Sequence, residues 1–392
     1  MSAASNATLD ASGPLILLAA GGTGGHLYPA EALARCLVEK GYRVALVTDR
    51  RGAGFGAVLP TVQTFRINAA SPSGNLLKKV RGAVDLLIGM LQSRRIVRKH
   101  KPAMAIGFGG YPSVPPLLAA GAAGIPVVLH EQNAILGRAN RMMAPRCTAL
   151  ATAFSDVSGV PSMRGVREQT GNPVRSAIEE FRGAPYVLPD PKERLRVLIL
   201  GGSQGARVFS KIIPPALEML PQNLRARLSV TQQCRSEDLE EVQQTYETLG
   251  VKANLRSFFE DVPQRLAHAH LVICRAGAST MAELATVGRP AVLIPYPYAA
   301  DNHQLANAKA MAQVGGGWVV PEPEFTPTTF AARLETILTN PESLVPVAEA
   351  ARSLAIDDAA DRLADLVERI LRASPKMRDS SSAAPENSAG EQ

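Results

Sequence analysis

Three glycine-rich turns and one histidine have residue types and spacing that suit chemistry on an anion. The turns are Gly21-Gly-Thr-Gly-Gly-His26, Gly201-Gly-Ser-Gln-Gly-Ala206 and Arg275-Ala-Gly-Ala-Ser279. Glycine tolerates positive φ and lets the backbone approach a ligand closely, and the N–H groups at the start of a following helix attract anions. The turns therefore predict a phosphate or diphosphate site, with Ser203 offering a hydroxyl to a phosphate.

None of these turns matches a standard nucleotide motif. If Gly22 and Gly24 are aligned with G-x-G-x-x-G, Leu27 stands where the last glycine belongs. Asp49 lies about where a ribose-binding acid is expected, so the first turn alone leaves a dehydrogenase open. The second turn lacks the Lys-Ser/Thr of a Walker loop, which argues against ATP hydrolysis. A tight strand-to-helix turn without a ligand is the alternative interpretation.

The third turn has two interpretations. Ser279 and Thr280 are suitable N-cap residues with Glu283 about one turn later, so a capping box explains the pattern without a ligand. The other interpretation is that the helix start binds a diphosphate while Glu283 accepts hydrogen bonds from ribose hydroxyls. We favour the ligand because three such turns occur in one chain.

Polar clusters follow other apolar runs. Tyr111 lies in Gly107–Ser113, His130-Glu-Gln-Asn133 follows Val127–Leu129, and Asp301-Asn-His-Gln304 follows Ala291–Ile294. Such groups fit the edge of a sheet where doubly wound folds bind ligands. A buried polar network and a solvated loop are the alternatives.

The elements that must position these residues are short apolar runs separated by helical segments. The runs are continuous rather than alternating, as expected of strands buried on both faces; they include Leu15–Ala20, Val44–Val47, Met104–Ile106, Val197–Leu200 and Leu271–Cys274. Helical spacing occurs in Pro29–Lys40 and Phe209–Leu220. This alternation predicts an α/β protein with doubly wound sheets.

The chain predicts two similar halves. Leu15–His26 and Leu195–Ala206 both read as a strand, a Gly-Gly pair, a hydroxyl residue, a glycine and a helix. Two Rossmann-like domains of this kind would face each other across a cleft. The boundary is predicted at Gly171–Arg175, followed by a proline-rich linker at 183–191.

Composition narrows the class of protein. The net charge of +7 suits acidic substrates or an anionic membrane surface, and no nucleic-acid-binding motif is present, so nucleic acid is not expected as a partner. Four scattered cysteines indicate a reduced compartment, and no H-E-x-x-H motif occurs, so we predict neither a metal site nor a cofactor. The first residues do not read as a signal peptide and no run is long enough to span a bilayer, so we expect a cytoplasmic location.

One segment is strongly basic. Between Leu76 and Lys101 the sequence has a lone acid, Asp85, against eight basic residues: Lys78, Lys79, Arg81, Arg94, Arg95, Arg98, Lys99 and Lys101. One face is lined by apolar residues at helical spacing: Leu76, Leu77, Val80, Val84, Leu87 and Leu91. A helix packed on a sheet would account for much of the apolar face. The basic excess predicts contact with anionic lipid.

Taken together and in order, the motifs resemble one family of enzymes. It is the family of UDP-N-acetylglucosamine transferases that convert lipid I to lipid II in peptidoglycan synthesis. The matching segments run from about residue 14 to 372 and are the three glycine turns with Pro29 and Glu283, Gly109-Gly-Tyr-Pro112, His130–Asn133, Gly171-Asn-Pro-Val-Arg175 and Asp301–Gln304.

The resemblance implies the GT-B fold. It implies a disordered tail at 1–13, an N-terminal acceptor and membrane domain at 14–175, a C-terminal donor domain at 176–345, a helix at about 346–373 that returns to the first domain, and a disordered tail at 374–392. It also implies UDP-N-acetylglucosamine as donor and undecaprenyl-linked lipid I as acceptor. The location implied is the cytoplasmic side of the cell membrane, held peripherally.

The resemblance also implies which residues contact the donor. Carried over by motif, they are Thr23, Gly24, Gly25, Tyr111, Asn133, Arg175, Ser203, Phe259 through its backbone, Ala278, Ser279, Thr280, Met281, Ala282, Glu283 and Gln304. His303 stands where some members have glutamine.

The reaction expected from the resemblance needs a base and a stabilised leaving group. We expect the acceptor's C4 hydroxyl to displace UDP with inversion at the anomeric carbon. His26 is the preferred base because imidazole titrates near neutral pH, and Glu131 is the second choice. An orienting role for His26 is the alternative. No D-x-D sequence is present, so helix N-termini and Arg175 are expected to stabilise the diphosphate.

Three other functions compete with this one. A UDP-N-acetylglucosamine 2-epimerase shares the donor but needs no membrane acceptor. A nucleotide-sugar sensor would bind the donor without needing His26. An NAD-dependent oxidoreductase is disfavoured by the missing fingerprint glycine.

Overall fold

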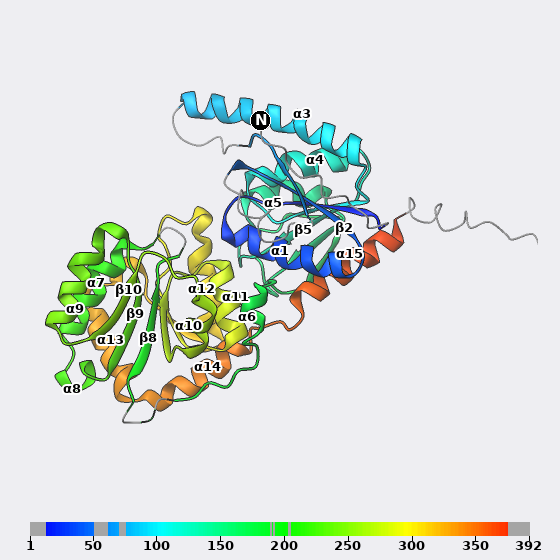
Figure 1. Cartoon of the computed structure of the whole chain (residues 1–392). Helices are drawn as coiled ribbons and strands as arrows, with labels where there is room; N and C mark the ends of the chain where they lie inside the picture. Colours follow the sequence, from blue (N-terminus) through cyan, green and yellow to red (C-terminus); the bar gives the residue numbers. More distant parts are fainter. Residues whose placement is uncertain are drawn as a thin grey trace, which may run out of the picture.

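The computed structural model consists of two α/β lobes, each built on a parallel sheet (Figure 1). The structure describes residues 13–50, 62–69, 76–188, 190, 193–202 and 205–374, without the side chains of 76–81. The tails predicted at 1–13 and 374–392 lie outside the described residues except for Gly13 and Ser374. The prediction of two Rossmann-like domains is confirmed, and the GT-B fold with it.

The first lobe has a seven-stranded sheet in the order β3-β2-β1-β4-β5-β6-β7. Its strands are β1 (Leu15–Ala19), β2 (Arg43–Thr48), β3 (Gln63–Arg66), β4 (Met104–Gly107), β5 (Val127–Glu131), β6 (Ala149–Thr152) and β7 (Val166–Gln169). All neighbouring pairs are parallel. The chain leaves β1 toward one edge and β4 toward the other, so the switch point where such folds bind ligands lies between these two strands.

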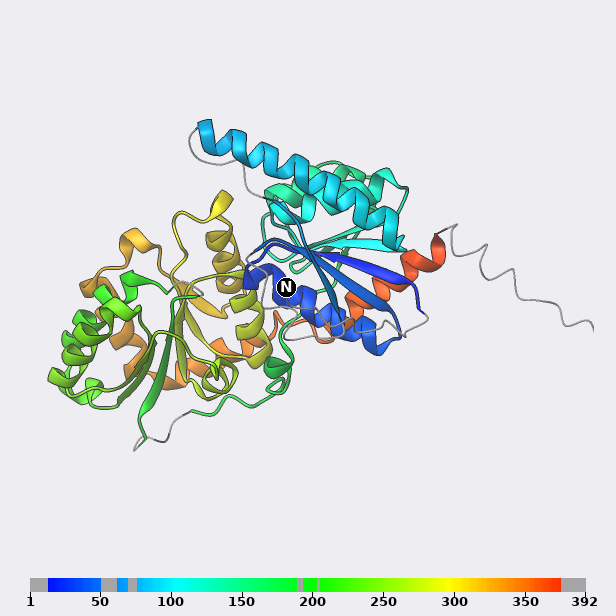
Figure 2. The same ribbon diagram turned by 45° about the horizontal axis from the view of Figure 1, so that its top comes forward.

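Helices cover both faces of this sheet (Figures 1 and 2). On one face lie α3 (Leu76–His100), α4 (Val114–Ala122) and α5 (Arg138–Met143). On the other lie α1 (Gly24–Glu39) and α15 (Ala359–Ala373). Alternate residues of β1 supply the two cores: Ile16 and Leu18 pack with α1 and α15, and Leu17 with α4.

The second lobe repeats this plan with a six-stranded sheet in the order β10-β9-β8-β11-β12-β13. Its strands are β8 (Leu195–Leu200), β9 (Leu228–Gln233), β10 (Lys252–Arg256), β11 (Leu271–Cys274), β12 (Ala291–Leu293) and β13 (Gly317–Val319). Its helices include α7 (Arg207–Glu218), α9 (Leu239–Thr248), α10 (Val262–His268), α11 (Ala278–Val287), α12 (His303–Gln313) and α13 (Pro327–Thr339). The switch point here lies between β8 and β11.

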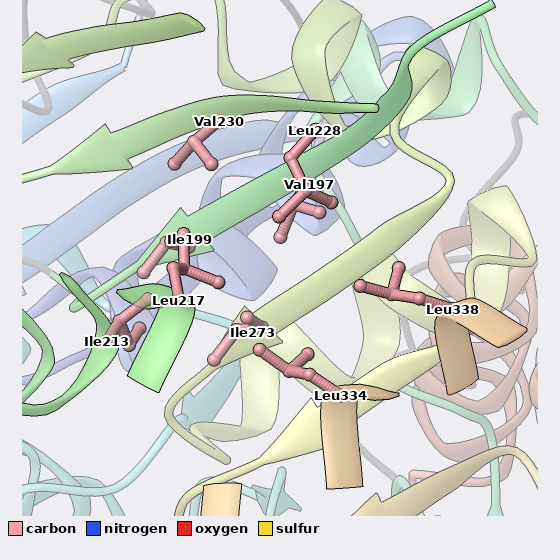
Figure 3. A pocket seen from close by; sticks show the side chains of 9 residues that line it. All are labelled: Val197, Ile199, Ile213, Leu217, Leu228, Val230, Ile273, Leu334 and Leu338. Atoms are coloured by element: carbon pink, nitrogen blue, oxygen red, sulfur yellow. The ribbon is translucent and has the colours of Figure 1, made fainter. Parts of the chain in front are cut away.

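One face of the second sheet is filled by aliphatic side chains. Val197, Ile199 and Ile273 of the sheet meet Ile213 and Leu217 of α7, with Leu334 and Leu338 of α13 opposite (Figure 3). A narrow gap lined by these side chains contains no polar lining residue. This lobe therefore holds its sheet by apolar packing, which leaves the loop ends of the strands free for polar residues.

The chain crosses between the lobes twice. The first crossing is at Gly171–Arg175, followed by the short helix α6 (Ser176–Glu179). The second lies between α14 (Leu344–Arg352) and α15. The helix predicted at about 346–373 is therefore two helices: Ala351 of α14 is in the core of the second lobe, and α15 packs on α1 of the first.

Polar contacts hold α15 on α1. The Cys36 thiol donates to Asp361 Oδ1 at 3.2 Å, Lys40 Nζ lies 3.1 Å from Asp365 Oδ1, and the Tyr42 hydroxyl donates to Glu368 at 3.2 Å. The C-terminal helix thus ties the second crossing to the first lobe.

Among the described residues, no helix is both long and apolar enough to span a bilayer. All four cysteines are free and buried.

Candidate active site

The first glycine turn lies beside the turn that follows β4. Gly21 N donates to Gly109 O at 3.1 Å, which joins the two turns at the switch point of the first sheet. Helix α1 then starts at Gly24 with Thr23 as its N-cap, and no side chain caps it. Its first turn has no acidic residue, so its free N–H groups can donate hydrogen bonds to an anion. Thr23, Gly24 and Gly25 thus lie at the start of this helix, and their contact with the donor stays a prediction.

His26 lies in a slot with glycine walls. A Cβ added to Gly21 would lie 3.2 Å from His26 Cδ2, and one added to Gly109 would lie 3.3 Å from Cε1. Gly109 and Gly110 also have φ of +87° and +77°, which disfavours any side chain there. Glycine at these positions is therefore explained by the close approach of the imidazole ring.

Burial lowers the pKa of His26 below its usual value. The charge of Glu131 and the hydrogen bonds to Gln132 and the Phe108 backbone raise it, and His303 lowers it further. Because desolvation is the largest of these effects, the ring is neutral at neutral pH and can accept a proton.

Glu131 is 1% exposed, and both of its carboxylate oxygens are occupied. Oε1 accepts from Asn133 N and Nδ2, each at 3.0 Å, and Oε2 accepts from Gly137 N and Asn140 Nδ2, each at 2.9 Å. These contacts shape the loop after β5, so they favour a positioning role over the role as base that the sequence suggested as second choice.

The start of α11 differs from the capping box considered above. Gly277 is the N-cap and no side chain caps the helix, so Ser279 and Thr280 lie inside its first turn. The capping-box interpretation was therefore wrong, because the helix begins one residue before Ser279. Ser279 Oγ is buried without a partner among the described residues. A free hydroxyl and free backbone N–H groups at one helix start suit a phosphate.

Glu283 lies on this helix, paired with an arginine from the first crossing. Arg175 Nε and Nη2 lie 2.9 Å and 2.7 Å from Glu283 Oε1. Arg175 also stacks on Tyr28 of α1, with Cζ 4.7 Å from the ring centroid. Burial raises the pKa of Glu283, and the charge of Arg175 opposes that rise. No hydrogen bond from a described residue reaches Oε2.

Asn307 of α12 joins the lobes and was missed in the sequence. Its Nδ2 donates to Asn133 Oδ1 and Ala276 O, both at 3.1 Å, and its Oδ1 accepts from Ala134 N at 2.9 Å. Asn307 is fully buried. The signal that could have found it is an amide among small residues on the buried side of a helix.

The residues of the Asp301–Gln304 cluster make different contacts. Asp301 forms an ion pair with Arg138 of the first lobe, with Nη2 2.9 Å from Oδ1, so it bridges the lobes. Gln304 Oε1 accepts from Tyr296 N at 2.9 Å and Ala276 N at 3.3 Å, which leaves its Nε2 to donate. His303 Nδ1 contacts Ala300 O at 2.7 Å.

The remaining predicted residues are placed as follows. Tyr111 opens a 3-10 turn after Gly110, and Met281 and Ala282 face a pocket between the lobes. Phe259 is 3% exposed beneath Arg265, whose Cζ is 4.3 Å from the ring centroid. Ser203 lies outside the described residues.

The pocket between the lobes has a volume of about 620 Å³, including space open to solvent. It is lined by the ends of β6 and β7, one face of α11, α12, and both crossings, including Gly171 and Ile356. Glu283 does not line it, so the pocket and the ion pair with Arg175 lie on different sides of α11.

Two family models match the chain. The glycosyltransferase family 28 N-terminal domain matches residues 16–152, and the C-terminal domain of the same family matches residues 196–363.

Named relatives are similar over nearly the whole chain. A Rhodospirillum centenum protein named UDP-N-acetylglucosamine--N-acetylmuramyl-(pentapeptide) pyrophosphoryl-undecaprenol N-acetylglucosamine transferase is 53% identical over 353 residues, covering 90% of this chain and 93% of that protein. A protein of the same name from Paramagnetospirillum magneticum is also 53% identical, covering 90% and 96%.

Solved structures resemble the whole molecule. The crystal structure of Acinetobacter baumannii MurG has a TM-score of 0.73 at 30% identity, covering 91% of this chain and 99% of that chain. The glycosyltransferase VinC in complex with dTDP has a TM-score of 0.64 at 15% identity, covering 92% and 100%, which is a likeness of fold alone.

Proposed function

The chain belongs to the family of UDP-N-acetylglucosamine--N-acetylmuramyl-(pentapeptide) pyrophosphoryl-undecaprenol N-acetylglucosamine transferases, and from this premise we propose that it converts lipid I to lipid II. It transfers N-acetylglucosamine from UDP-N-acetylglucosamine to the C4 hydroxyl of the muramoyl sugar. The observation that carries the proposal is the position of His26 at the uncapped start of α1, where burial lowers its pKa.

The donor is held between the starts of α1 and α11. The free N–H groups of both helices and the unpartnered Ser279 hydroxyl bind the diphosphate. Glu283 Oε2 accepts hydrogen bonds from the ribose hydroxyls while Oε1 keeps Arg175 in place. Gln304 Nε2 donates to the sugar, since its oxygen is already engaged by two backbone N–H groups.

The reaction is a single displacement. His26 accepts the proton of the C4 hydroxyl as the oxygen of that hydroxyl bonds to the anomeric carbon of the donor. The bond from that carbon to the diphosphate oxygen breaks on the opposite side, so the configuration inverts and UDP leaves. Negative charge grows on the diphosphate, where the helix N-termini and Arg175 stabilise it.

Exposed apolar residues on the outer helix α3 are evidence that the acceptor lies in a membrane. Val84, Leu87 and Leu91 are 48%, 67% and 56% exposed, so the expectation that the apolar face packs on the sheet was wrong for these three residues. The buried side of α3 is instead formed by Gly89, Ser93 and Val97. The prediction for Leu76, Leu77 and Val80 concerns side chains outside those that the structure describes.

The exposed apolar residues of α3 continue into a basic run on the same side of the helix. At 100° per residue, Arg95 and Arg98 fall within about 40° of the direction of Val84, and both are exposed. An apolar stripe followed by basic residues suits insertion at an anionic lipid surface, where each basic residue contributes on the order of 1 kcal/mol. We propose peripheral binding of α3 to the cytoplasmic side of the cell membrane.

Vesicle flotation tests the membrane proposal. Binding is expected to rise with the anionic lipid fraction and to fall in Leu87→Ser and Arg95→Glu. The matched control is Arg225→Glu, an arginine of the second lobe. Binding that ignored anionic lipid content would contradict the proposal.

One assay tests the transfer itself. The protein, UDP-N-acetylglucosamine and vesicles containing lipid I are expected to yield lipid II and UDP, with and without excess chelator. Complete loss in chelator would mean that a metal takes part. Epimerised UDP-sugar formed without lipid I would favour the 2-epimerase, and donor binding without turnover would favour a sensor.

A further inference from the structure

A chain of hydrogen bonds runs from His26 to the first crossing between the lobes. His26 Nδ1 lies 3.3 Å from Gln132 Oε1, Gln132 Nε2 lies 3.0 Å from His130 Nδ1, and His130 Nε2 lies 2.9 Å from Gly171 O. His130 and Gln132 are almost fully buried. These hydrogen bonds therefore connect His26, the base of the proposed reaction, to the point where the polypeptide leaves the first lobe.

The end of this chain at Gly171 sets the direction of every hydrogen bond in it. A carbonyl oxygen only accepts, so His130 Nε2 carries a proton and donates it to Gly171 O. Burial lowers the pKa of His130 to about 4, so its other nitrogen, Nδ1, has no proton at neutral pH. Gln132 Nε2 must then be the donor to Nδ1.

The orientation of the Gln132 amide is independently supported. Its Nε2 also donates to His130 O at 3.1 Å, so a flipped amide would place two oxygens against each other. Gln132 Oε1 therefore faces His26 Nδ1, which must donate. The hydrogen bond to Gln132 thus places the proton of neutral His26 on Nδ1 and leaves Nε2 without a proton.

Gly171 lies where the two crossings touch. Its φ is +84°, and a Cβ there would lie 2.7 Å from Ile356 Cβ and 3.0 Å from Ala359 Cβ. A side chain at this position would collide with the second crossing, so glycine is required where Gly171 O accepts the hydrogen bond from His130.

We propose that His130 and Gln132 are positioning residues that hold His26 in its Nδ1–H tautomer, so that Nε2 accepts the proton of the acceptor hydroxyl. The proposal rests on the proposed function for the role of His26 as base. The charged and titratable groups that act on His26 are Glu131 and His303, and His26 itself acts on His130.

Nitrogen-15 NMR of labelled histidines tests the tautomer without measuring activity. The chain has six histidines, and a His26→Gln sample identifies the signals of His26. In the wild-type protein we expect a protonated Nδ1 and an unprotonated Nε2 on neutral His26. A predominant Nε2–H form would overturn the proposal.

Two substitutions of His130 separate the two ends of the chain. His130→Asn keeps an acceptor near the position of Nδ1 and should retain the tautomer, whereas His130→Gln keeps a donor near Gly171 O and should lose it. We expect kcat to fall about 10-fold or more in His130→Gln, within the range that a general base contributes, with donor KM little changed. Equal losses in the two variants would contradict the proposal.

Gln132 provides a test through the pH profile. Gln132→Glu places an anion beside His26 and raises the pKa of His26, so the acidic limb of kcat/KM should move to higher pH. Gln132→Met has a similar size without hydrogen bonds and should lower kcat about 10-fold or more, and thermal unfolding checks that both fold. His268→Gln, at an exposed helix end, is the matched control for His130→Gln.

The outcomes distinguish this proposal from the proposed function. If His26→Ala retained full turnover, the role of His26 as base would fail while the tautomer could still be observed. If His26→Ala abolished turnover but Gln132→Met left kcat and the pH profile unchanged, the positioning role would fail alone.

Discussion

The six strands of the second sheet follow the same order as the first six strands of the first sheet, yet the helices that start at the two switch points carry different groups. In the first lobe, α1 follows β1, the first strand at the switch point, and carries His26, which can exchange a proton. In the second, α11 carries Ser279 and Glu283, which can bind a ligand but are not placed as base. The comparison teaches that the sheet places the site, while the first turn of each helix decides its role.

The helices that precede the second switch-point strand of each lobe differ as well. Before β4 lies α3, with 25 residues and an exposed apolar stripe, whereas before β11 lies α10, with seven residues. Pro263 and Leu266 of α10 are buried. The additional length of α3 therefore provides an exposed face on which a membrane surface can bind.

The largest expected effect is on the chemistry of the first lobe. His26→Ala should lower kcat by about 10²–10⁴, because the acceptor hydroxyl loses its base, while calorimetry should find the donor dissociation constant nearly unchanged. Turnover within a few-fold of wild type would mean that α1 does not supply the base, so the comparison of α1 with α11 would fail.

The next effect is a loss of stability in acid that involves both lobes. Burial lowers the pKa of His130 in the first lobe and His270 in the second to about 4. Between that value and about 6.5 the unfolded chain binds protons that the folded one does not, so stability should fall as pH drops through this window, by up to about 3 kcal/mol per histidine. Denaturant unfolding of His270→Gln across this range should show a shallower slope, and an unchanged slope would contradict the assignment.

A smaller effect is expected on donor binding by the second lobe. Glu283→Gln should weaken donor affinity by about 1.5–3 kcal/mol, the usual value for a hydrogen bond to a charged group. The reason is that the ribose loses its charged acceptor, and calorimetry measures it. Turnover at saturating donor should stay within a few-fold. Glu342→Gln, an exposed acid of the same lobe, is the control.

The smallest effect is expected on the exposed side of α3. Leu87→Ser should change the free energy of unfolding by no more than about 0.5 kcal/mol, because that side chain is 67% exposed. Val97→Ala on the buried side should cost about 1–3 kcal/mol. Equal losses, measured by urea unfolding, would mean that the stripe packs on the protein.

The strands that the sequence revealed are those whose apolar residues are continuous. β1, β4, β8 and β11 are buried almost throughout and were predicted from their runs. The edge strands β3 and β10 were missed because their exposed residues, such as Gln63 and Arg256, interrupt the pattern. Edge strands have one neighbour, so less of their length needs to be apolar.

Of the candidate site, the glycine turns and the helix starts could be predicted. Glycine next to an apolar run has few other uses. The partners of the polar residues could not be predicted, because Arg175 and Glu283 are 108 positions apart. Asn133 and Asn307 could not be paired from the sequence either, because they are 174 positions apart.

The sequence by itself determined the two doubly wound lobes and the glycine-rich turns between their strands and helices, because periodicity and glycine content are local properties of the chain. Only the tertiary structure decided that Glu131 is occupied by loop contacts and that the apolar stripe of α3 faces outward. It also decided that hydrogen bonds connect His26 to Gly171 through Gln132 and His130. Those outcomes depend on which distant groups reach hydrogen-bonding distance, and that is set by how the layers and lobes pack.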